Sequence, residues 1–162
     1  MSIHRGFTSI ATTLATVAVA ACQGSLSGLD LGNDSVAGIT YRVTSLAIAE
    51  SFPVQIGVTV EIENELSTPN SIVFPDGCVV LLRAYSDGPD PVWDMAGTVG
   101  CTQALVQLGL PPHARKNFES GLVSAATILG DSLPNGEYRI TAYLRPGEVV
   151  ELNAGTVDLA VP

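Results

Sequence analysis

Basic residues are scarce in this chain. Its 162 residues include 7 lysines and arginines against 16 aspartates and glutamates, which gives a formal net charge of −9 at pH 7. Nucleic acid and anionic lipid head groups are bound through clusters of positive charge, so both are poor partners for this protein. The acidity favours solubility and repulsion from an anionic membrane surface instead.

Catalytic signatures are missing as well. The chain has no glycine-rich phosphate loop of the Walker or dinucleotide type and no Gly-x-Ser-x-Gly nucleophile motif. One of its 2 histidines is His4, and the other, His113, follows two prolines and stands close to Arg115. A catalytic histidine needs a nucleophile and an orienting acid around it, so we interpret His113 as a solvated turn residue. We expect no enzymatic activity, cofactor or metal.

The chain also lacks an apolar run of the ~20 residues that a membrane-spanning helix needs. A shorter uncharged run, residues 6–21, follows Arg5 and has the plan of a secretory signal. It ends in Val19-Ala20-Ala21-Cys22, which resembles the lipobox of bacterial lipoproteins. The resemblance implies cleavage before Cys22, diacylglycerol on the Cys22 sulfur and acylation of the new amino terminus.

Lipidation would anchor the protein to the bacterial membrane on its extracytoplasmic side, because two or more acyl chains give lasting attachment. Gln23 stands where an aspartate would argue for retention at the inner membrane, so the outer membrane is favoured. The alternative is ordinary cleavage after Ala21, which would leave a free cysteine at the mature terminus.

Two further cysteines, Cys78 and Cys101, complete the 3 in the chain. An even pair in an exported chain predicts a disulfide, which for a loop of this length would contribute roughly 3 kcal/mol to stability. A metal pair is the alternative. Neither cysteine has a Cys-x-x-Cys partner or a nearby histidine, so we expect the disulfide.

The domain boundaries follow from composition. Residues 1–21 are expected to be a lipoprotein signal peptide, and residues 22–38 the lipidated cysteine and a flexible tether rich in Gly, Ser and Asp. Such a tether would span roughly 20 Å as a random coil. Residues 39–162 are expected to form one domain, since 46% hydrophobic and 14% charged residues argue against disorder.

Residues that alternate between apolar and polar indicate strands in this domain. The clearest strand is residues 54–63, and residues 39–43 and 138–144 alternate in the same way, with the first of these strands expected to continue to residue 49. Cys78–Tyr85 is a nearly continuous apolar run, as in a central strand covered on both faces. Shorter strands are expected at residues 71–74 and 117–124.

Weaker signals occupy the rest of the chain. Residues 92–94 fit a short strand or turn, residues 97–107 are the least regular, and residues 125–129 fit one helical turn. Asn153-Ala154-Gly155 is predicted to be a three-residue hairpin turn between two last strands. No segment has a sustained helical period. The pattern predicts an all-β, immunoglobulin-like antiparallel β-sandwich of about seven to nine strands.

Three side-chain groups need separate interpretation. Trp93 could be a binding aromatic, but a single tryptophan beside a strand of a sandwich is usually part of the core. Asp87, Asp90 and Asp94 lie in one loop and could reach a calcium ion, although acidic loops are common without metal. Alternating glutamates at residues 61–65 fit the solvated side of a strand and its turn.

Several motifs in this order resemble the intracellular proteinase inhibitor (BsuPI) domain family over about residues 54–146. They are Val60-Glu61-Ile62-Glu63-Asn64 with Ser71-Ile72-Val73-Phe74, then Val92-Trp93-Asp94 with Gln103-Ala104-Leu105 and Leu110-Pro111-Pro112, and finally Pro134-Asn135-Gly136-Glu137-Tyr138-Arg139-Ile140-Thr141-Ala142-Tyr143-Leu144. The resemblance implies an immunoglobulin-like sandwich and inhibition of a subtilisin-type serine protease. This chain departs from the family in being exported, in its cysteine pair, and in having His113 where the turn often has glycine.

These features predict a protein that binds rather than catalyses. Recognition is expected from the loop of residues 97–107, because a Cys78–Cys101 disulfide would order one side of it in advance and so reduce the entropy cost of binding. Its candidate binding residues are Gly97, Thr98, Val99, Gly100, Thr102 and Gln103. The alternative is a structural or assembly module of the cell envelope, with an exposed sheet edge that pairs with a partner strand.

Overall fold

The structure is a computed structural model that describes residues 31–49 and 51–162. The predicted signal peptide, Cys22 and most of the predicted tether lie outside the described residues.

Alternating apolar residues build the first sheet. β2 (Ile39–Ala49) and β3 (Gln55–Asn64) pair antiparallel, and the apolar side chains on one face of β3 are buried, namely Ile56, Val58, Val60 and Ile62. β1 (Asn33–Val36) pairs with β2, while β8 (Arg115–Glu119) and β9 (Val123–Ser124) pair with successive parts of β3. The alternation predicted for residues 54–63 is confirmed.

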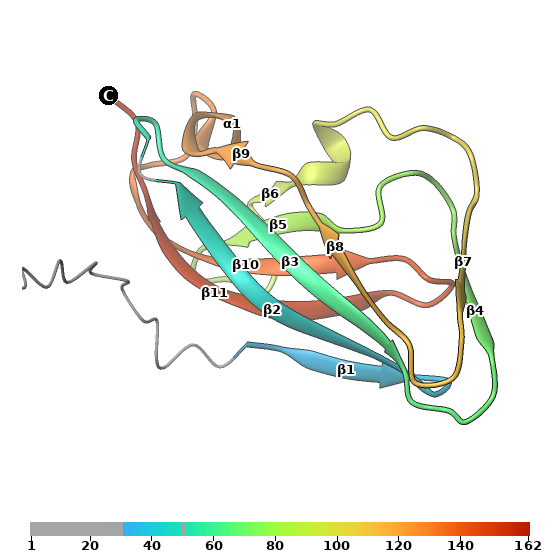
Figure 1. The fold of residues 1–162 in the computed structure, drawn as a ribbon. Coiled ribbons are helices and arrows are strands. Elements are labelled where there is room, and N and C mark those ends of the chain that lie inside the picture. Colours follow the sequence, from blue (N-terminus) through green and yellow to red (C-terminus); the bar gives the residue numbers. More distant parts are fainter. Residues whose placement is uncertain (1–30, 50) are drawn as a thin grey trace, which may run out of the picture.

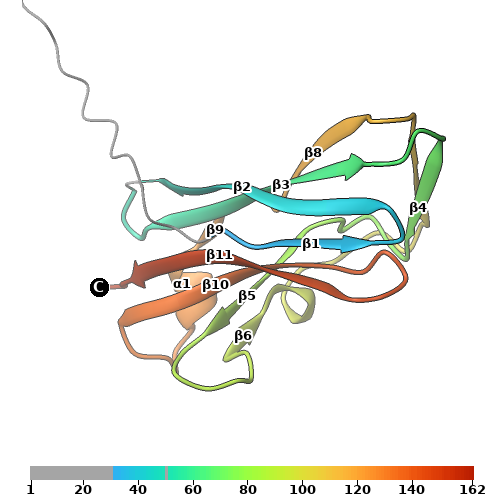
Figure 2. The ribbon, with the colours of Figure 1, turned by 90° about the horizontal axis from the view of Figure 1, so that it is seen from below.

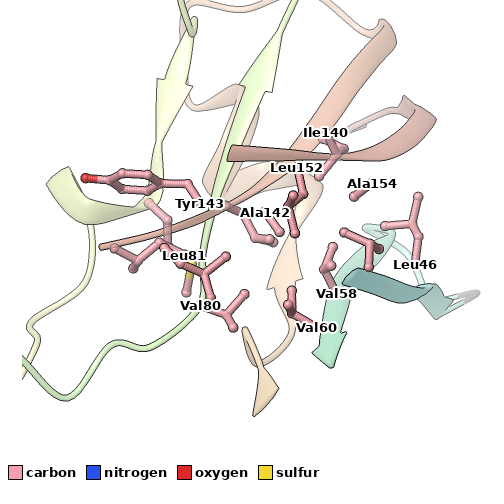
Figure 3. Close-up of a cluster of buried hydrophobic side chains, with 14 of the residues drawn as sticks. Leu46, Val58, Val60, Val80, Leu81, Ile140, Ala142, Tyr143, Leu152 and Ala154 are labelled. Atoms are coloured by element: carbon pink, nitrogen blue, oxygen red, sulfur yellow. The ribbon is translucent and has the colours of Figure 1, made fainter. Parts of the chain in front are cut away.

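The second sheet packs face to face on the first (Figures 1 and 2). Its antiparallel order is β11 (Val150–Leu159), β10 (Gly136–Leu144), β5 (Leu81–Tyr85) and β6 (Trp93–Asp94). In Figure 3, Leu46, Val58 and Val60 of the first sheet lie opposite Leu152 and Ala154 of the second. β4 (Asn70–Phe74) and β7 (Val106–Leu110) form a separate pair that covers one end of the sandwich (Figure 1).

Two short helical turns interrupt the strands, and each is capped by the side chain before it. Asp94 accepts a hydrogen bond from the Ala96 N–H at 2.9 Å and starts η1 (Met95–Gly97). Ser124 accepts one from the Thr127 N–H at 3.1 Å and starts α1 (Ala125–Leu129), the single helical turn predicted there. Within residues 31–49 and 51–162, no helix has the length and apolar character required to cross a bilayer.

The antiparallel immunoglobulin-like sandwich is therefore confirmed. The Tyr138 hydroxyl donates to the Pro134 carbonyl at 2.7 Å, and a tyrosine that bonds back to the backbone at the start of a strand is a feature of such folds. The described residues contain eleven strands rather than seven to nine, because β1, β6 and β9 are segments of only two to four residues.

The predicted tether, residues 22–38, extends too far toward the C-terminus, because it includes a strand. Residues 33–36 form β1, which pairs with residues 39–42 of β2 through a tight turn at Ala37 and Gly38. Its first three side chains are exposed and give no apolar alternation, and only the half-buried Val36 packs against the core. The ordered domain accordingly begins before residue 39.

The predicted hairpin turn at Asn153-Ala154-Gly155 is wrong. β11 runs through these residues without a break, and its pairing shifts so that Ile140 lies opposite Gly155 while Thr141 lies opposite Asn153. Ala154 is the extra residue of a β-bulge, and Gly155 supplies the positive φ of 113° beside it. Gly155 does adopt the positive φ that was expected of it, but it does so beside a β-bulge and not in a turn.

The bounds of other strands also differ from those predicted. The run Cys78–Tyr85 is a strand only from Leu81 onward, and residues 117–124 divide into β8 and β9 around Ser120. The Ser120 side chain accepts the Val58 N–H at 3.0 Å, in place of a strand partner. The stretch predicted as irregular ends in β7, whose Leu108 and Leu110 are buried.

Candidate binding loop

The predicted disulfide is present and fixes the candidate loop. Cys78 and Cys101 are joined with an S–S distance of 2.06 Å and a Cα–Cα distance of 5.5 Å. Beside the bond, the Gly77 N–H donates to the Thr102 carbonyl at 3.0 Å. Residues 98–105, between η1 and β7, are therefore held at their middle by one covalent and one hydrogen bond.

The segment that holds the loop is itself fixed. The Asp76 carboxylate accepts the Cys78 N–H at 3.0 Å and forms an ion pair with Arg145, just beyond β10. Gly77 lies close to the loop, since a Cβ there would meet the Thr102 Oγ1 at 2.2 Å unless that side chain rotated. The disulfide thus connects the loop to the end of the second sheet.

The six predicted binding residues stay on one continuous segment. Val99 is half-buried, and the rest are exposed, namely Gly97, Thr98, Gly100, Thr102 and Gln103. The structure divides their surroundings, however. Thr98 and Val99 line a cavity next to Trp93, whereas Thr102 packs on Gly77 on the other side of the disulfide.

An exposed apolar patch borders the loop, and sequence reasoning missed it. Leu105, Val73 and Val149 are 72%, 46% and 62% exposed, and they line one cavity of about 440 Å³. Pro75 and Gly147 complete its apolar walls, and Arg145 stands at its margin. We call Val73, Leu105 and Val149 the Leu105 patch. No periodicity could reveal it, because its members come from three segments far apart in the chain.

A second cavity, of about 310 Å³, lies on the other side of the loop. Trp93, only 9% exposed, belongs to the core as the sandwich pattern predicted, and it also lines this cavity with Met95 and Val99. The Trp93 indole Nε1–H is buried and has no hydrogen-bond partner among the described residues. Most buried donors have one, so an indole N–H without a partner is unusual.

A charged network covers the outer face of the second sheet. Arg83 forms ion pairs with Asp94 at 2.9 Å and with Glu151 at 2.8 Å. The Glu151 carboxylate also accepts the hydroxyls of Thr141, at 2.7 Å, and of Tyr85. These bonds join β6, β5, β10 and β11 across the sheet.

Aromatic stacking extends this network. The Arg83 guanidinium lies 3.8 Å from the centroid of the Tyr143 ring, and that of Arg139 lies 4.1 Å from the centroid of the Tyr85 ring. Each stack adds a cation–π attraction and shields the ring from water. Together they explain why Thr141, Tyr143 and Tyr85 are buried on the outer side of their strands.

The pKa values in the network follow from these contacts. Burial raises the pKa of Glu151, but the hydrogen bonds from Tyr85, Thr141 and Arg83 outweigh burial, so its pKa is lowered overall. Burial, with the hydrogen bond to Glu151, raises the pKa of Tyr85. Glu151 is thereby held as a carboxylate and Tyr85 as a phenol. The groups satisfy one another, and we assign this network to the stability of the sheet.

The other candidate side chains, His113 and the three aspartates of residues 87–94, do not come together in a common site. His113 lies on the predicted turn, in the left-handed region with φ of 55°, and the Ala114 N–H closes this turn on the Pro111 carbonyl at 3.1 Å. Asp94 is engaged by Arg83 and by the cap of η1, so it does not meet Asp87 and Asp90 at a common point. Within the described chain, the metal-like group is Asp76 with Cys78 and Cys101, whose sulfurs are in the disulfide.

Comparison with known proteins identifies no family for this chain. No protein-family model matches the chain, and no curated protein matches it either. Among solved structures, a β-glucosidase from Listeria innocua in complex with glucose is similar over 78% of this chain, with 14% identity and a TM-score of 0.40. A β-glucosidase involved in saponin metabolism from intestinal bacteria has 11% identity and a TM-score of 0.41 over the same share.

The chain spans 17% of the length of each of these enzymes. Such values are too low to transfer either activity to this protein.

Proposed function

We propose that this protein is a binding module held outside the cytoplasm by a lipid on Cys22, and that it recognises a protein partner through the Leu105 patch and the adjoining disulfide loop. The observation that supports this proposal best is the exposure of Leu105, Val73 and Val149 around one cavity. Contiguous apolar surface on a soluble domain is a common mark of an interaction site.

The disulfide makes this surface suited to binding. A loop that is already ordered loses little conformational entropy when a partner arrives, and residues 98–105 are held at Cys101 and Thr102. Recognition loops on a rigid scaffold follow the same physical principle. An oxidising compartment is where such a bond persists, which agrees with export through the proposed signal peptide.

The partner to test first is a subtilisin-type serine protease, as the resemblance to the BsuPI family implies. The full-length protein, extracted from membranes, is titrated against the protease, and stoichiometric inhibition at micromolar concentration is the expected result. No loss of protease activity at that concentration would remove the inhibitor proposal.

A pair of variants tests whether the Leu105 patch carries the interaction. Leu105→Asp should weaken binding by about 10-fold or more, since it places a charge in a desolvated apolar contact. Phe52→Asp is the matched control, because Phe52 is 71% exposed but lies in the turn between β2 and β3, away from β4 and β7 (Figure 1). Equal effects of the two substitutions would contradict the assignment of this surface.

The anchor needs its own measurement. Intact mass spectrometry of the membrane-extracted protein should show a chain that begins at Cys22, carries acyl groups, and has lost two hydrogens through the disulfide. A chain that retains residues 1–21, or an unmodified Cys22, would contradict lipidation without affecting the proposed binding surface.

The alternative is an assembly module of the cell envelope that pairs through a sheet edge. β8 ends its sheet and pairs only with β3 in the described chain, so its outer edge is open. However, the exposed Arg115 and Lys116 on this strand are of the kind that protect edges from pairing. Recovery of the same non-protease partner from detergent-solubilised envelopes would favour this alternative.

A further inference from the structure

The sequence contains one Asn-Gly pair, Asn135-Gly136, at the point where the chain enters β10. Both residues are exposed to solvent. In such a pair the backbone nitrogen after the asparagine can reach the amide carbon of its side chain, and a glycine has no Cβ that would shield this nitrogen. This is the arrangement in which an asparagine loses its amide nitrogen without the help of an enzyme.

The side-chain amide of Asn135 is held by the backbone of Val161. Its Nδ2 donates to the Val161 carbonyl at 3.0 Å, and its Oδ1 accepts the Val161 N–H at 3.0 Å. The two bonds extend the ladder between β10 and β11 beyond its first pair, Gly136 with Leu159. Val161 is half-buried and packs against the core, so it is a fixed partner for the amide.

The backbone on both sides of Asn135 is fixed as well. Before it, the Pro134 carbonyl accepts the Tyr138 hydroxyl at 2.7 Å. After it, Gly136 is paired with Leu159. The part of Asn135 that is free to move is therefore its side chain, and the two bonds described above decide how often it does so.

We propose that Asn135 is a site of spontaneous deamidation and that its hydrogen bonds to Val161 set the rate. In this reaction the Gly136 nitrogen bonds to Cγ of Asn135, the Cγ–Nδ2 bond breaks, and ammonia leaves with the proton of the Gly136 nitrogen. Water then opens the five-membered imide at either of its carbonyls, which gives aspartate or isoaspartate. The attack comes on the face of the amide, so the side chain must rotate, and two hydrogen bonds to one residue hold its orientation.

The product would loosen this end of the second sheet. An aspartate at this position still accepts the Val161 N–H, but it has no N–H to donate to the Val161 carbonyl. An isoaspartate adds an atom to the backbone ahead of β10, which shifts Gly136 relative to Leu159. The modification is independent of the proposed protein-binding surface, because neither Asn135 nor Val161 lines the cavity of the Leu105 patch.

Peptide mapping by mass spectrometry measures the reaction. The folded full-length protein, with its disulfide intact, is incubated at neutral pH, and the fraction of aspartate and isoaspartate at position 135 is followed over weeks. Val161→Pro removes the N–H that the Asn135 Oδ1 accepts and should raise the rate by about 3- to 10-fold, as expected when hydrogen bonds of modest net strength are lost. Val161→Ala keeps both backbone groups and is the matched control, which should react at the wild-type rate.

Unfolded protein supplies the reference rate. In concentrated urea the wild type and both variants should react at one common rate, faster than the folded wild type, because the side chain is then free to rotate. A second readout needs no variant: as urea is added to the wild type, hydrogen exchange at the Val161 N–H should accelerate together with the modification.

Three results would overturn the proposal. They are a folded wild type that reacts as fast as the unfolded chain, equal rates for Val161→Pro and Val161→Ala, and a modification rate that rises with urea while exchange at Val161 does not. None of these results bears on protease inhibition, which Leu105→Asp tests separately.

Discussion

The side chain of Asn64 is completely buried at the end of β3. Its Nδ2 group lies 2.9, 3.1 and 3.0 Å from the carbonyl oxygens of Thr68, Leu110 and Pro111, and its Oδ1 accepts the Leu66 N–H at 3.1 Å. One amide thus bonds to the backbone of the turn that follows β3 and to the end of β7. The sequence placed Asn64 just after the predicted strand of residues 54–63, but nothing in it revealed these partners.

Asn64→Ala should destabilise the protein by about 2–4 kcal/mol, because it leaves several buried backbone groups without partners. The measurement is the midpoint of urea unfolding with the disulfide intact. Asn117→Ala, on the exposed side of β8, is the control and should change stability by less than about 0.5 kcal/mol. A small effect at Asn64 would mean that water replaces the amide at these turns.

At the scale of elements, one glycine joins the two sheets. Gly32 lies between Asn153 of β11 and Val43 of β2, and a Cβ at this position would lie 2.5 Å from the Asn153 backbone nitrogen. Because the neighbouring atom is backbone, the contact cannot be relieved by a side-chain rotation. The last residues before β1 therefore contribute to closing the sandwich.

Gly32→Ala should lower the free energy of unfolding by about 1–3 kcal/mol through this overlap, and hydrogen exchange at Val43 should accelerate. Gly88→Ala is a suitable control, since a Cβ there meets no atom within 4 Å and should be neutral or slightly stabilising. If both variants unfold at the same denaturant concentration, the entry of the chain does not hold the sheets together.

The charged network on the second sheet makes stability depend on pH. The pKa of Glu151 is lower in the folded protein than its ordinary value of 4.5. The carboxylate therefore stabilises the fold above about pH 4.5, and this contribution is lost as pH falls through the lowered pKa. Glu151→Gln should cost roughly 1 kcal/mol at neutral pH and should make the acid side of the stability curve shallower.

Glu148→Gln, which changes an exposed glutamate in the turn before β11, should leave the acid side of the curve unchanged. Thermal unfolding between pH 3 and 7 distinguishes the two variants. Parallel curves for wild type and Glu151→Gln would show that the Arg83–Glu151 contact is too solvated to contribute.

The sequence predicted elements where one face of a strand is buried, and it failed where backbone geometry alone decides. Residues 54–63 alternate and form β3, whereas residues 33–36, in which Val36 is the one apolar residue, form β1 by pairing without an apolar alternation. The glycine of residues 153–155 serves a bulge instead of a turn. β7 was missed although Leu108 and Leu110 alternate, because residues 97–107 were predicted to be irregular.

At the scale of the whole molecule, the sandwich class follows from the strand pattern, but the sites do not. The two cysteines predicted their bond, which the structure confirms. The Leu105 patch and the Trp93 cavity each gather residues from several elements, and only the folded chain brings these together. The contacts of the loop around Cys101 therefore depend on the tertiary structure. Its disulfide, in contrast, can be inferred from the even number of cysteines in a chain that is expected to be exported.

Removing that attachment should affect stability and recognition together. The cysteines are 23 residues apart, and closing a loop of this length restricts the unfolded chain enough to contribute about 3 kcal/mol. The double variant Cys78→Ala/Cys101→Ala should lose that much free energy of unfolding, which a lower midpoint of urea unfolding would show. Reduced wild type should behave in the same way. Proteolysis within residues 98–105 should also become faster, because the Gly77–Thr102 hydrogen bond would then hold the middle of the loop without a covalent bond beside it, while Thr98 and Val99 stay bonded to the Met95 carbonyl. Unchanged cleavage with lowered stability would separate the two effects and place the order of the loop in its backbone contacts.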